Sequence, residues 1–191
     1  MDSIDLRLGD YYYCRKMNDY LREVKFRIGN TWQKDNSIFL RSLQIKDALT
    51  SYKWRNNPEV WKHTQNKPDK FITQDMETSW IKGVLKRKNE KRFAICYQGR
   101  YIGNIHLSNI HHTRESSAQV HIFIGEPECW GKGIGTTAIN LIADYAFKKL
   151  KFCILYAAID RKNAASLKAF EKAKFIYLFD MGNERHLMRV R

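Results

Sequence analysis

The chain has 191 residues, of which 43% are hydrophobic and 13% aromatic, so it can bury a sizeable core in one domain, with or without an added segment. Its formal net charge of +14 favours anionic partners, although a general lysine bias would produce the same charge. No apolar run reaches the roughly 20 residues that span a bilayer, no basic-then-apolar leader is visible, and the four cysteines show no metal-ligand spacing. We therefore expect a cytoplasmic protein with reduced cysteines, no membrane contact and no metal. Because no zinc-finger or recognition-helix signature appears, we expect no nucleic acid as a partner.

The first segment of the chain differs from the remainder. Apolar residues recur at helical spacing between Tyr13 and Ile28, and Gly29-Asn30 would end that helix. This pattern predicts an N-terminal helical extension over residues 1–36, followed by the main domain over residues 37–191.

Within the main domain, hydrophobic periodicity and turn residues predict strands mixed with helices. In chain order we expect a strand over 38–43, helices over 45–55, 59–63 and 73–88, a hairpin of strands 92–97 and 101–107, a polar loop over 109–117, and a strand over 119–124. Next come a helix over 138–150, a strand over 152–159, a helix over 164–174, and a hairpin of strands 175–181 and 186–190. Thr73 is the expected N-cap of its helix. This order predicts an α/β (α+β) domain with a largely antiparallel sheet.

The most informative motif is a glycine-rich segment between the strand 119–124 and the helix that follows it. It reads Trp130-Gly131-Lys132-Gly133-Ile134-Gly135-Thr136. Three glycines in five residues let the backbone pass close to a ligand, and the free amides at the start of a helix attract anions. The motif therefore predicts a binding site for phosphate.

This segment, the apolar strand before it and the later Asn163-Ala164-Ala165-Ser166 occur in an order that resembles the GCN5-related N-acetyltransferase (GNAT) family. The resemblance covers about residues 37–190, and it is closest to the branch of ribosomal-protein-alanine and amino-sugar acetyltransferases. It implies the GNAT fold, in which a central, mostly antiparallel mixed sheet of six to seven strands is splayed in the middle and flanked by helices. It also implies acetyl-CoA as the donor and a primary amine of a small molecule as the acceptor.

The same resemblance assigns cofactor-binding positions. The backbone amides of Gly131, Lys132, Gly133, Ile134, Gly135 and Thr136 would hold the pyrophosphate, and the backbone of Ile122, Phe123 and Ile124 would pair with the pantetheine arm as an added strand. Asn163 would lie near that arm, although it also fits a plain helix N-cap. Phe170 stands where the family usually has a tyrosine that protonates the leaving thiolate, and Lys174 replaces a family glycine.

Catalysis requires a neutral amine, alignment of the reactants and stabilisation of the oxyanion. Gln119 stands where many relatives carry a glutamate base and cannot take that role. We expect His121, two residues further on the same face of the strand, or Glu126 at the strand's end to be the base. The alternatives are a hydrogen-bonded strand histidine and a solvated loop acid. A backbone amide near Ile124 would stabilise the oxyanion.

The acceptor site is predicted from the segment after the first strand. By the resemblance, Trp54, Arg55, Asn56 and His63 would bind the amine substrate, although Trp54 also fits core packing. Because the chain is strongly basic, an anionic acceptor such as a nucleotide-linked amino sugar fits better than a polyamine. A protein N-terminus or lysine as acceptor, and a non-catalytic acyl-CoA sensor, remain open alternatives, as do a monomer and a homodimer.

Overall fold

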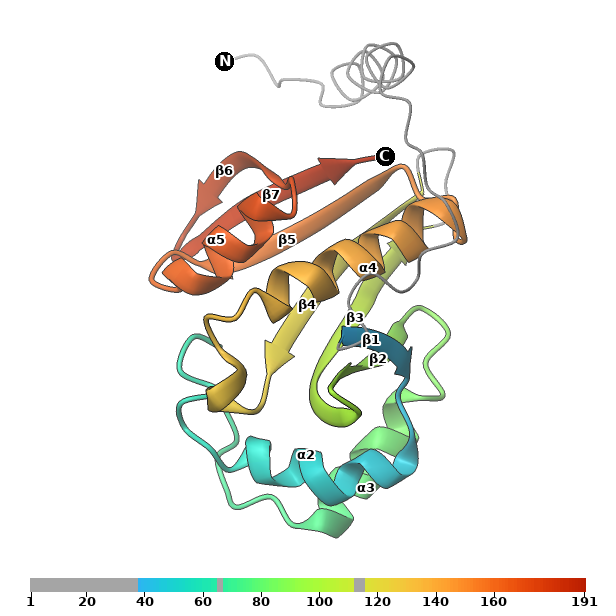
Figure 1. The fold of residues 1–191 in the computed structure, drawn as a ribbon, viewed down its shortest axis with the longest axis vertical. Coiled ribbons are helices and arrows are strands. Elements are labelled where there is room, and N and C mark those ends of the chain that lie inside the picture. Colours follow the sequence, from blue (N-terminus) through green and yellow to red (C-terminus); the bar gives the residue numbers. More distant parts are fainter. Residues whose placement is uncertain (1–37, 65–66, 112–115) are drawn as a thin grey trace. The chain divides into compact units, whose positions relative to one another are not determined.

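The computed structural model describes residues 38–64, 67–111 and 116–191, so the extension expected over 1–36 lies outside the described residues (Figure 1). The described residues form a seven-stranded sheet with the strand order β1-β2-β3-β4-β5-β7-β6. The pairs β1–β2, β2–β3, β3–β4 and β6–β7 are antiparallel, whereas β4–β5 is parallel. The expected mixed, mostly antiparallel sheet of the α+β class is therefore confirmed.

The helices and strands follow the expected order. The strands are β1 (Ile38–Ser42), β2 (Lys91–Tyr97), β3 (Arg100–His111), β4 (Ser117–Ile124), β5 (Ile154–Asp160), β6 (Ile176–Met181) and β7 (Glu184–Val190). The helices are α2 (Ala48–Arg55), α3 (Gln74–Val84), α4 (Ile134–Lys148) and α5 (Ala164–Lys172), with short 3₁₀ helices at Ile45–Asp47 and Pro127–Cys129. Thr73 is the N-cap of α3, because its side chain accepts a hydrogen bond from the Met76 amide at 3.3 Å.

Some expected boundaries were wrong. The segment 59–63 forms turns rather than a helix, because its backbone bonds span three residues, as from Trp61 N–H to the Pro58 carbonyl. Helix α3 ends at Val84 instead of near residue 88, and α4 begins at Ile134, four residues earlier than expected. The loop expected over 109–117 is strand at both ends, since strand pairing in β3 and β4 overrides the local polarity.

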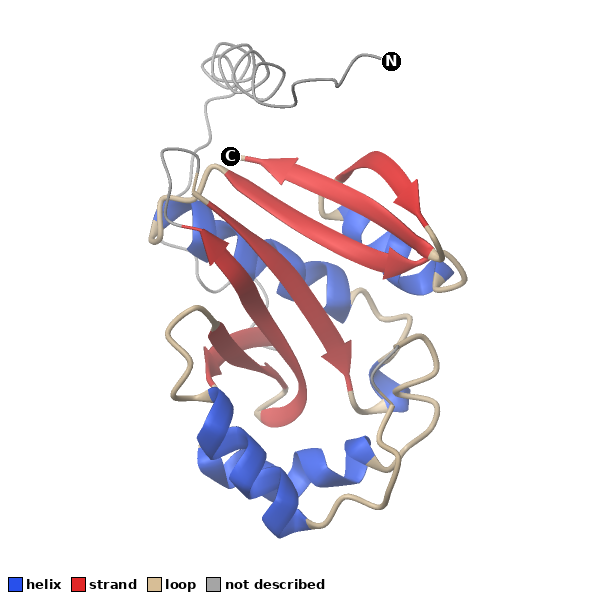
Figure 2. Ribbon diagram, turned by 180° about the vertical axis from the view of Figure 1, so that it is seen from behind, coloured by secondary structure: helices blue, strands red, loops and turns tan. Residues whose placement is uncertain are grey.

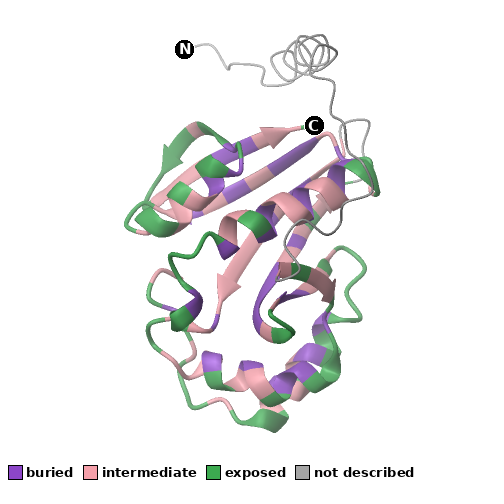
Figure 3. Ribbon diagram, viewed as in Figure 1, coloured by how far each residue is buried: buried purple, intermediate pink, exposed green. Residues whose placement is uncertain are grey.

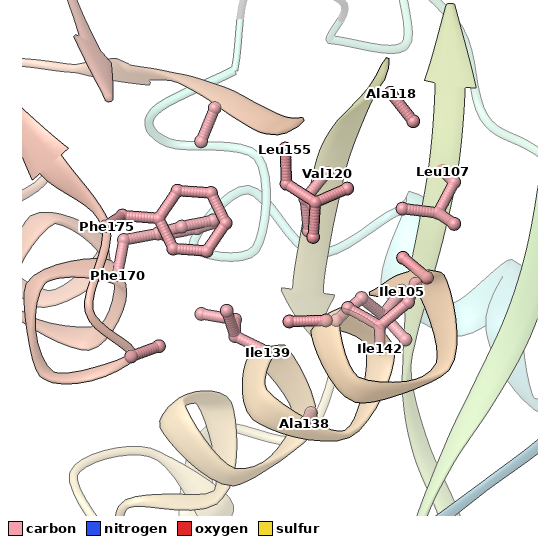
Figure 4. Packing of buried hydrophobic residues seen from close by; sticks show 14 of the residues in the cluster. Ile105, Leu107, Ala118, Val120, Ala138, Ile139, Ile142, Leu155, Phe170 and Phe175 are labelled. Carbon is pink, nitrogen blue, oxygen red and sulfur yellow. The ribbon is translucent and has the colours of Figure 1, made fainter. Parts of the chain in front are cut away.

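Helices α4 and α5 cover one face of the sheet. Helix α4 crosses in front of β4 and β5 in Figure 1 and behind them in Figure 2. Its buried side includes Ala138, Ile139, Ile142, Ala143 and Ala146, and the three alanines let the helix lie close to the sheet. These residues and the inward side chains of the strands form the main hydrophobic core (Figures 3 and 4).

Helix α2 packs on the opposite face of the sheet. The Trp54 ring lies 4.7 Å from the Tyr101 ring and 6.0 Å from the Phe123 ring, measured between centroids. The neighbouring Ile124 packs against the core under α4 instead. Because successive strand residues point to opposite faces, α2 and α4 lie on opposite sides of β4.

Strands β4 and β5 part midway along their length. Of the described residues, only three pairs join them, ending at Gln119 and Tyr156. Beyond that pair, Val120–Ile124 of β4 and Ala157–Asp160 of β5 diverge, as Figures 1 and 2 show. We call this unpaired region the split; it confirms the expected splay in the middle of the sheet.

Candidate active site

The edge of β4 that faces the split presents alternating backbone groups. The Gly125 amide donates to the Ile102 carbonyl on β3 at 2.8 Å, and the Phe123 carbonyl also lies against β3, at Gly103. Because backbone direction alternates along a strand, the amides of Ile122 and Ile124 face the split. An extended ligand can pair with these groups as an added strand.

Trp130 fixes the end of this edge. Its indole Nε1 donates to the Ile124 carbonyl at 3.0 Å, while 42% of the residue remains exposed. The bond ties the start of the glycine-rich segment to β4 and occupies the Ile124 carbonyl. The Ile124 amide therefore keeps its direction toward the split, as an oxyanion donor needs.

The glycine-rich segment forms an anion site at the start of α4. Gly131 and Gly133 have φ angles of +73° and +79°, a left-handed conformation that favours glycine, and Gly133 is the N-cap of α4. The amides of Ile134, Gly135 and Thr136 belong to the first helical turn, where amides have no partner within the helix, and that turn carries no acidic residue. Lys132 is exposed beside them. This segment fits a diphosphate group.

The helix start also adjoins the split. A Cβ added at Gly135 would lie 3.9 Å from Ile124 Cδ1, in ordinary contact. Ile134 is 2% exposed, so its side chain anchors α4 in the core while its amide remains at the surface of the helix end. A molecule bound by its phosphates here can extend along β4 into the split.

Asn163 and Phe170, both expected near the pantetheine arm, have structural partners. The Asn163 Oδ1 accepts from the Ser166 amide at 3.1 Å, so Asn163 is the N-cap of α5. Phe170 is 2% exposed and packs edge-on against Phe175, with 5.0 Å between ring centroids (Figure 4). A hydrogen-bonded cap can also contact a ligand through its Nδ2, whereas Phe170 offers no proton donor. Their contact with the cofactor stays a prediction.

Trp54 and Asn56 organise the segment between α2 and α3. Trp54 is 3% exposed and its Nε1 donates to Glu126 Oε1 at 3.0 Å. The Asn56 side chain donates to the Ile72 carbonyl and accepts from the Ile72 amide, both at 2.8 Å. Asn56 thus joins the two ends of this segment, and the polar groups of both residues are already engaged.

Arg55 is part of a buried network. Its guanidinium lies 4.6 Å from the Trp61 ring and 5.3 Å from the Trp80 ring, and its Nε is 3.5 Å from Glu77 Oε2. Burial raises the pKa of Glu77, and the Ser51 hydroxyl, which donates to it at 2.7 Å, opposes that rise. The network fixes α2 against α3, so the contacts of Arg55 are structural, and its binding of the acceptor stays a prediction.

His63 reaches across to the far side of the split. Its Nδ1 is 3.3 Å from Asp160 Oδ2 at the end of β5, while Trp61 in the same segment lies 5.5 Å from Phe123 on β4. The Lys162 amide and His63 both lower the pKa of Asp160. Of the four residues expected to bind the acceptor, the structure brings His63 to the split.

His121 lies on the α2 side of β4, as its spacing from Phe123 predicts. Its Nε2 is 2.8 Å from the Ser108 hydroxyl, and its ring stacks on His106 with 4.6 Å between centroids. Burial and then Arg92 lower the pKa of His121, so the imidazole is neutral at pH 7. A neutral ring can accept a proton, although a lowered pKa makes it a weaker base.

Glu126, the other expected base, follows β4 and accepts the Trp54 indole. Its second oxygen can still take a proton. The structure therefore gives both candidate bases a partner and tests neither role.

A cavity that no sequence motif predicts lies at the foot of the split. The cavity has a volume of about 310 Å³ and is lined by residues that include Gln119, Tyr156, Phe179 and His186. The last three come from β5, β6 and β7, and only their three-dimensional arrangement brings them beside β4.

Two other kinds of site are absent from residues 38–64, 67–111 and 116–191. No helix there is long and apolar enough to cross a membrane. No group of three His, Cys, Asp or Glu side chains there could hold a metal ion.

The split and the glycine-rich helix start suit an enzyme that transfers a group from an extended phosphate-bearing cofactor to a second substrate. Residues 37–176 match the family model of the acetyltransferase (GNAT) domain, so the chain belongs to the GNAT acetyltransferase family. It is an acetyl-CoA-dependent N-acetyltransferase.

Known proteins agree with this membership. The chain is 28% identical over 149 residues to the probable N-acetyltransferase YjcK of Bacillus subtilis, covering 74% of this chain and 82% of that protein. It is 26% identical over 151 residues to the uncharacterized protein MJ1062 of Methanocaldococcus jannaschii, covering 74% of this chain but only 28% of that longer protein. The spermidine N-acetyltransferase of Vibrio cholerae, solved with CoA and spermine, has the same fold, with a TM-score of 0.69 and 23% identity over 81% of this chain and 95% of that one.

Proposed function

We propose that the enzyme acetylates a primary amine carried by an anionic small molecule, such as a nucleotide-linked amino sugar. This proposal rests on the partners of the two carboxylates at the ends of the diverging strands. Glu126 accepts the Trp54 indole, and Asp160 is occupied by His63 and by the Lys162 amide, 2.9 Å away. A polyamine binds best to carboxylates with free oxygens, whereas both oxygens of Asp160 and one oxygen of Glu126 already have a protein partner. This supports an acceptor from the amino-sugar branch rather than a polyamine such as spermidine.

The net charge of +14 supports the same choice. A positive field attracts an anionic acceptor and slows the approach of a polycation. Part of that field serves coenzyme A, whose phosphates would be held by the amides of residues 131–136. The engaged carboxylates therefore support the proposed acceptor class, and the field would add to the rate of encounter.

We assign the steps of acetyl transfer to residues of the chain and, for the leaving thiolate, to water. An alkyl ammonium with a pKa of about 10.4 must lose a proton before its nitrogen attacks the thioester carbonyl. In our proposal His121 takes that proton, directly or through Ser108, and the Ile124 amide stabilises the oxyanion. Collapse of the intermediate breaks the carbon–sulfur bond, and the nitrogen releases its second proton to water. The thiolate, with a pKa of about 8.5, takes its proton from water because Phe170 has none to give.

The first experiment compares acceptors with the purified enzyme. Release of free thiol from acetyl-CoA is followed with a uridine-diphosphate-linked amino sugar, the same amino sugar without the nucleotide, spermidine, and a peptide with a free N-terminus. We expect the highest kcat/KM for the nucleotide-linked amine. A higher kcat/KM for spermidine or the peptide would overturn the acceptor class, and coenzyme A binding without turnover of any amine would favour an acyl-CoA sensor.

A His63→Ala variant tests whether the contact between His63 and Asp160 disfavours a polyamine. Removing the imidazole leaves Asp160 without its side-chain partner, so spermidine turnover should rise relative to turnover of the nucleotide-linked amine. Asp160→Asn combined with His63→Ala is the matched control, because it removes the freed charge. An unchanged ratio in the single variant contradicts the role assigned to Asp160.

A further inference from the structure

A cavity of about 310 Å³ lies at the foot of the split. Gln119 and Tyr156, which line it, are the last residue pair that joins β4 to β5 before the strands diverge. Gln119 also lies on the same face of β4 as His121 and Phe123, since strand residues two apart share a face. The cavity therefore borders the split on the side of α2, opposite α4 and the cofactor.

The β3 side of the cavity has an irregular backbone. Asn109 has a φ angle of +47°, a conformation that side-chain-bearing residues seldom adopt, and the β3–β4 register shifts between Ser108 and His111. Such irregularities in strands often redirect a side chain next to a functional site. Here Asn109 Nδ2 donates to Gln119 Oε1 at 2.9 Å. That bond orients both amides and leaves the Asn109 oxygen and the Gln119 nitrogen for a ligand.

The opposite side of the cavity is aromatic. The Phe179 and His186 rings stack at 4.6 Å with an angle of 15° between their planes, and both line the cavity. His186 Nε2 lies 3.9 Å from a Glu184 carboxylate oxygen, too far for a hydrogen bond, and is buried without a hydrogen-bond partner among the described residues. Phe179 lies in the edge strand β6 and is 49% exposed. A large exposed apolar ring beside a lined cavity is available to contact a ligand.

The lining carries hydrogen-bonding groups but no fixed charge. Of the eleven lining residues that the structure describes, none is Asp, Glu, Lys or Arg. Amides and a tyrosine hydroxyl can both donate and accept, which matches the hydroxyl groups of a sugar, and a flat ring can pack on a sugar's C–H face. A phosphate or a polyamine would lose its hydration here without gaining an opposite charge.

We propose that this cavity is a subsite for the uncharged sugar ring of the acceptor, with the ring between the Phe179–His186 stack and the Asn109–Gln119 amides. This assignment rests on the proposed function, because it supplies the part of an amino-sugar acceptor nearest the split. A volume of about 310 Å³ stands at the lower end of the roughly 300–1,000 Å³ of ligand pockets, which suits one ring rather than a complete nucleotide sugar. The charged remainder of the acceptor lies outside the cavity.

Binding of N-acetyl-D-glucosamine, an uncharged sugar, tests the subsite without requiring turnover. Saturation-transfer NMR with the coenzyme A-bound enzyme should show saturation of the sugar ring protons, and spermidine should show none. Phe179→Ala should abolish the effect. Met181→Ala is the matched control, because this residue is 61% exposed on the same strand and does not line the cavity. Saturation that is absent from the wild type, or equal in the two variants, overturns the subsite.

A second variant fills the cavity instead of removing a contact. Ala158→Leu adds volume to a lining position of β5, and unchanged coenzyme A affinity reports that the fold is intact. With an acceptor found in the amine comparison, Phe179→Ala and Ala158→Leu should each raise the acceptor KM about tenfold, with the acetyl-CoA KM unchanged. Turnover of an amino sugar with an unaltered acceptor KM rejects the subsite alone, whereas an enzyme that prefers spermidine rejects the proposed function.

Discussion

Replacing Gly133 with alanine should weaken coenzyme A binding beyond its effect on the fold. Gly133 is the N-cap of α4 and has a φ angle of +79°. An added Cβ would meet no protein atom within 4 Å, so the methyl group would point into space that a bound phosphate can use. An alanine also favours negative φ, and a backbone rotation here turns the first-turn amides of α4 away from their common direction.

Two magnitudes follow from this geometry. The left-handed conformation costs a residue with a Cβ about 1–2 kcal/mol, which in a chain of this length lowers the Tm by roughly 2–8 °C. Loss of one hydrogen bond to a charged phosphate costs about 1.5–3 kcal/mol, which corresponds to a roughly tenfold to hundredfold rise in the Kd of coenzyme A.

Gly182→Ala is the matched control for the stability cost of placing a side chain at a left-handed backbone position. Gly182 lies in the turn between β6 and β7, has a φ angle of +57°, and a Cβ there would also meet nothing within 4 Å. Calorimetric scans should show a similar loss of Tm in both variants, and isothermal titration should show weaker coenzyme A binding only in Gly133→Ala. Equal coenzyme A affinity in Gly133→Ala and the wild type would refute the assignment of the phosphate site.

Three further predictions concern stability. Lys174 has a φ angle of +64° after α5, so Lys174→Gly should raise the free energy of unfolding by about 1 kcal/mol in urea titrations; no change would contradict the strain at this position. Gly125→Ala should lower it by about 1–3 kcal/mol, because the new Cβ would overlap the buried Trp54 ring, and an unaltered urea midpoint would contradict that packing. Burial lowers the pKa of His106 to about 2, so its imidazole stays neutral in the folded protein. In the unfolded chain the same imidazole binds a proton below a pKa of about 6.5. Stability should therefore fall with decreasing pH below 6.5, by up to about 1.4 kcal/mol per pH unit for this group, and His106→Gln should reduce that slope; an identical slope in the variant would contradict the burial.

The features that local sequence predicted well depend on neighbouring residues. The glycine-rich segment before α4, the Thr73 cap and the Asn163 cap each follow from residue types within a few positions. The wrong boundaries lie where pairing with residues distant in the sequence determines the secondary structure. The end of β3, for example, is strand because it pairs with β4, with His111 opposite Ser117, and its polar sequence alone gives no sign of that pairing.

The acceptor side was harder to predict for the same reason. Asn56, proposed as a substrate contact, bonds to Ile72, and Trp54 bonds to Glu126, which lies 72 positions away. Tyr156 and Phe179, which line the cavity, carry no motif in their own segments, and only the strand order brings them next to β4. An exposed aromatic residue on an edge strand is the one sequence signal that could have pointed there.

In the proposed function, recognition of the two substrates is separated across β4. On the side of α4, the split presents backbone amides and a helix start, which recognise a cofactor without depending strongly on side chains. On the side of α2, side chains alone line the cavity and its border, and they come from segments that tolerate substitution, such as the edge strand β6 and the turns after Pro58. A chain can therefore change its acceptor by altering Phe179 or His63 while its cofactor site stays intact. Under this proposal, the separation would let this chain share a fold with a spermidine acetyltransferase and yet accept a different amine.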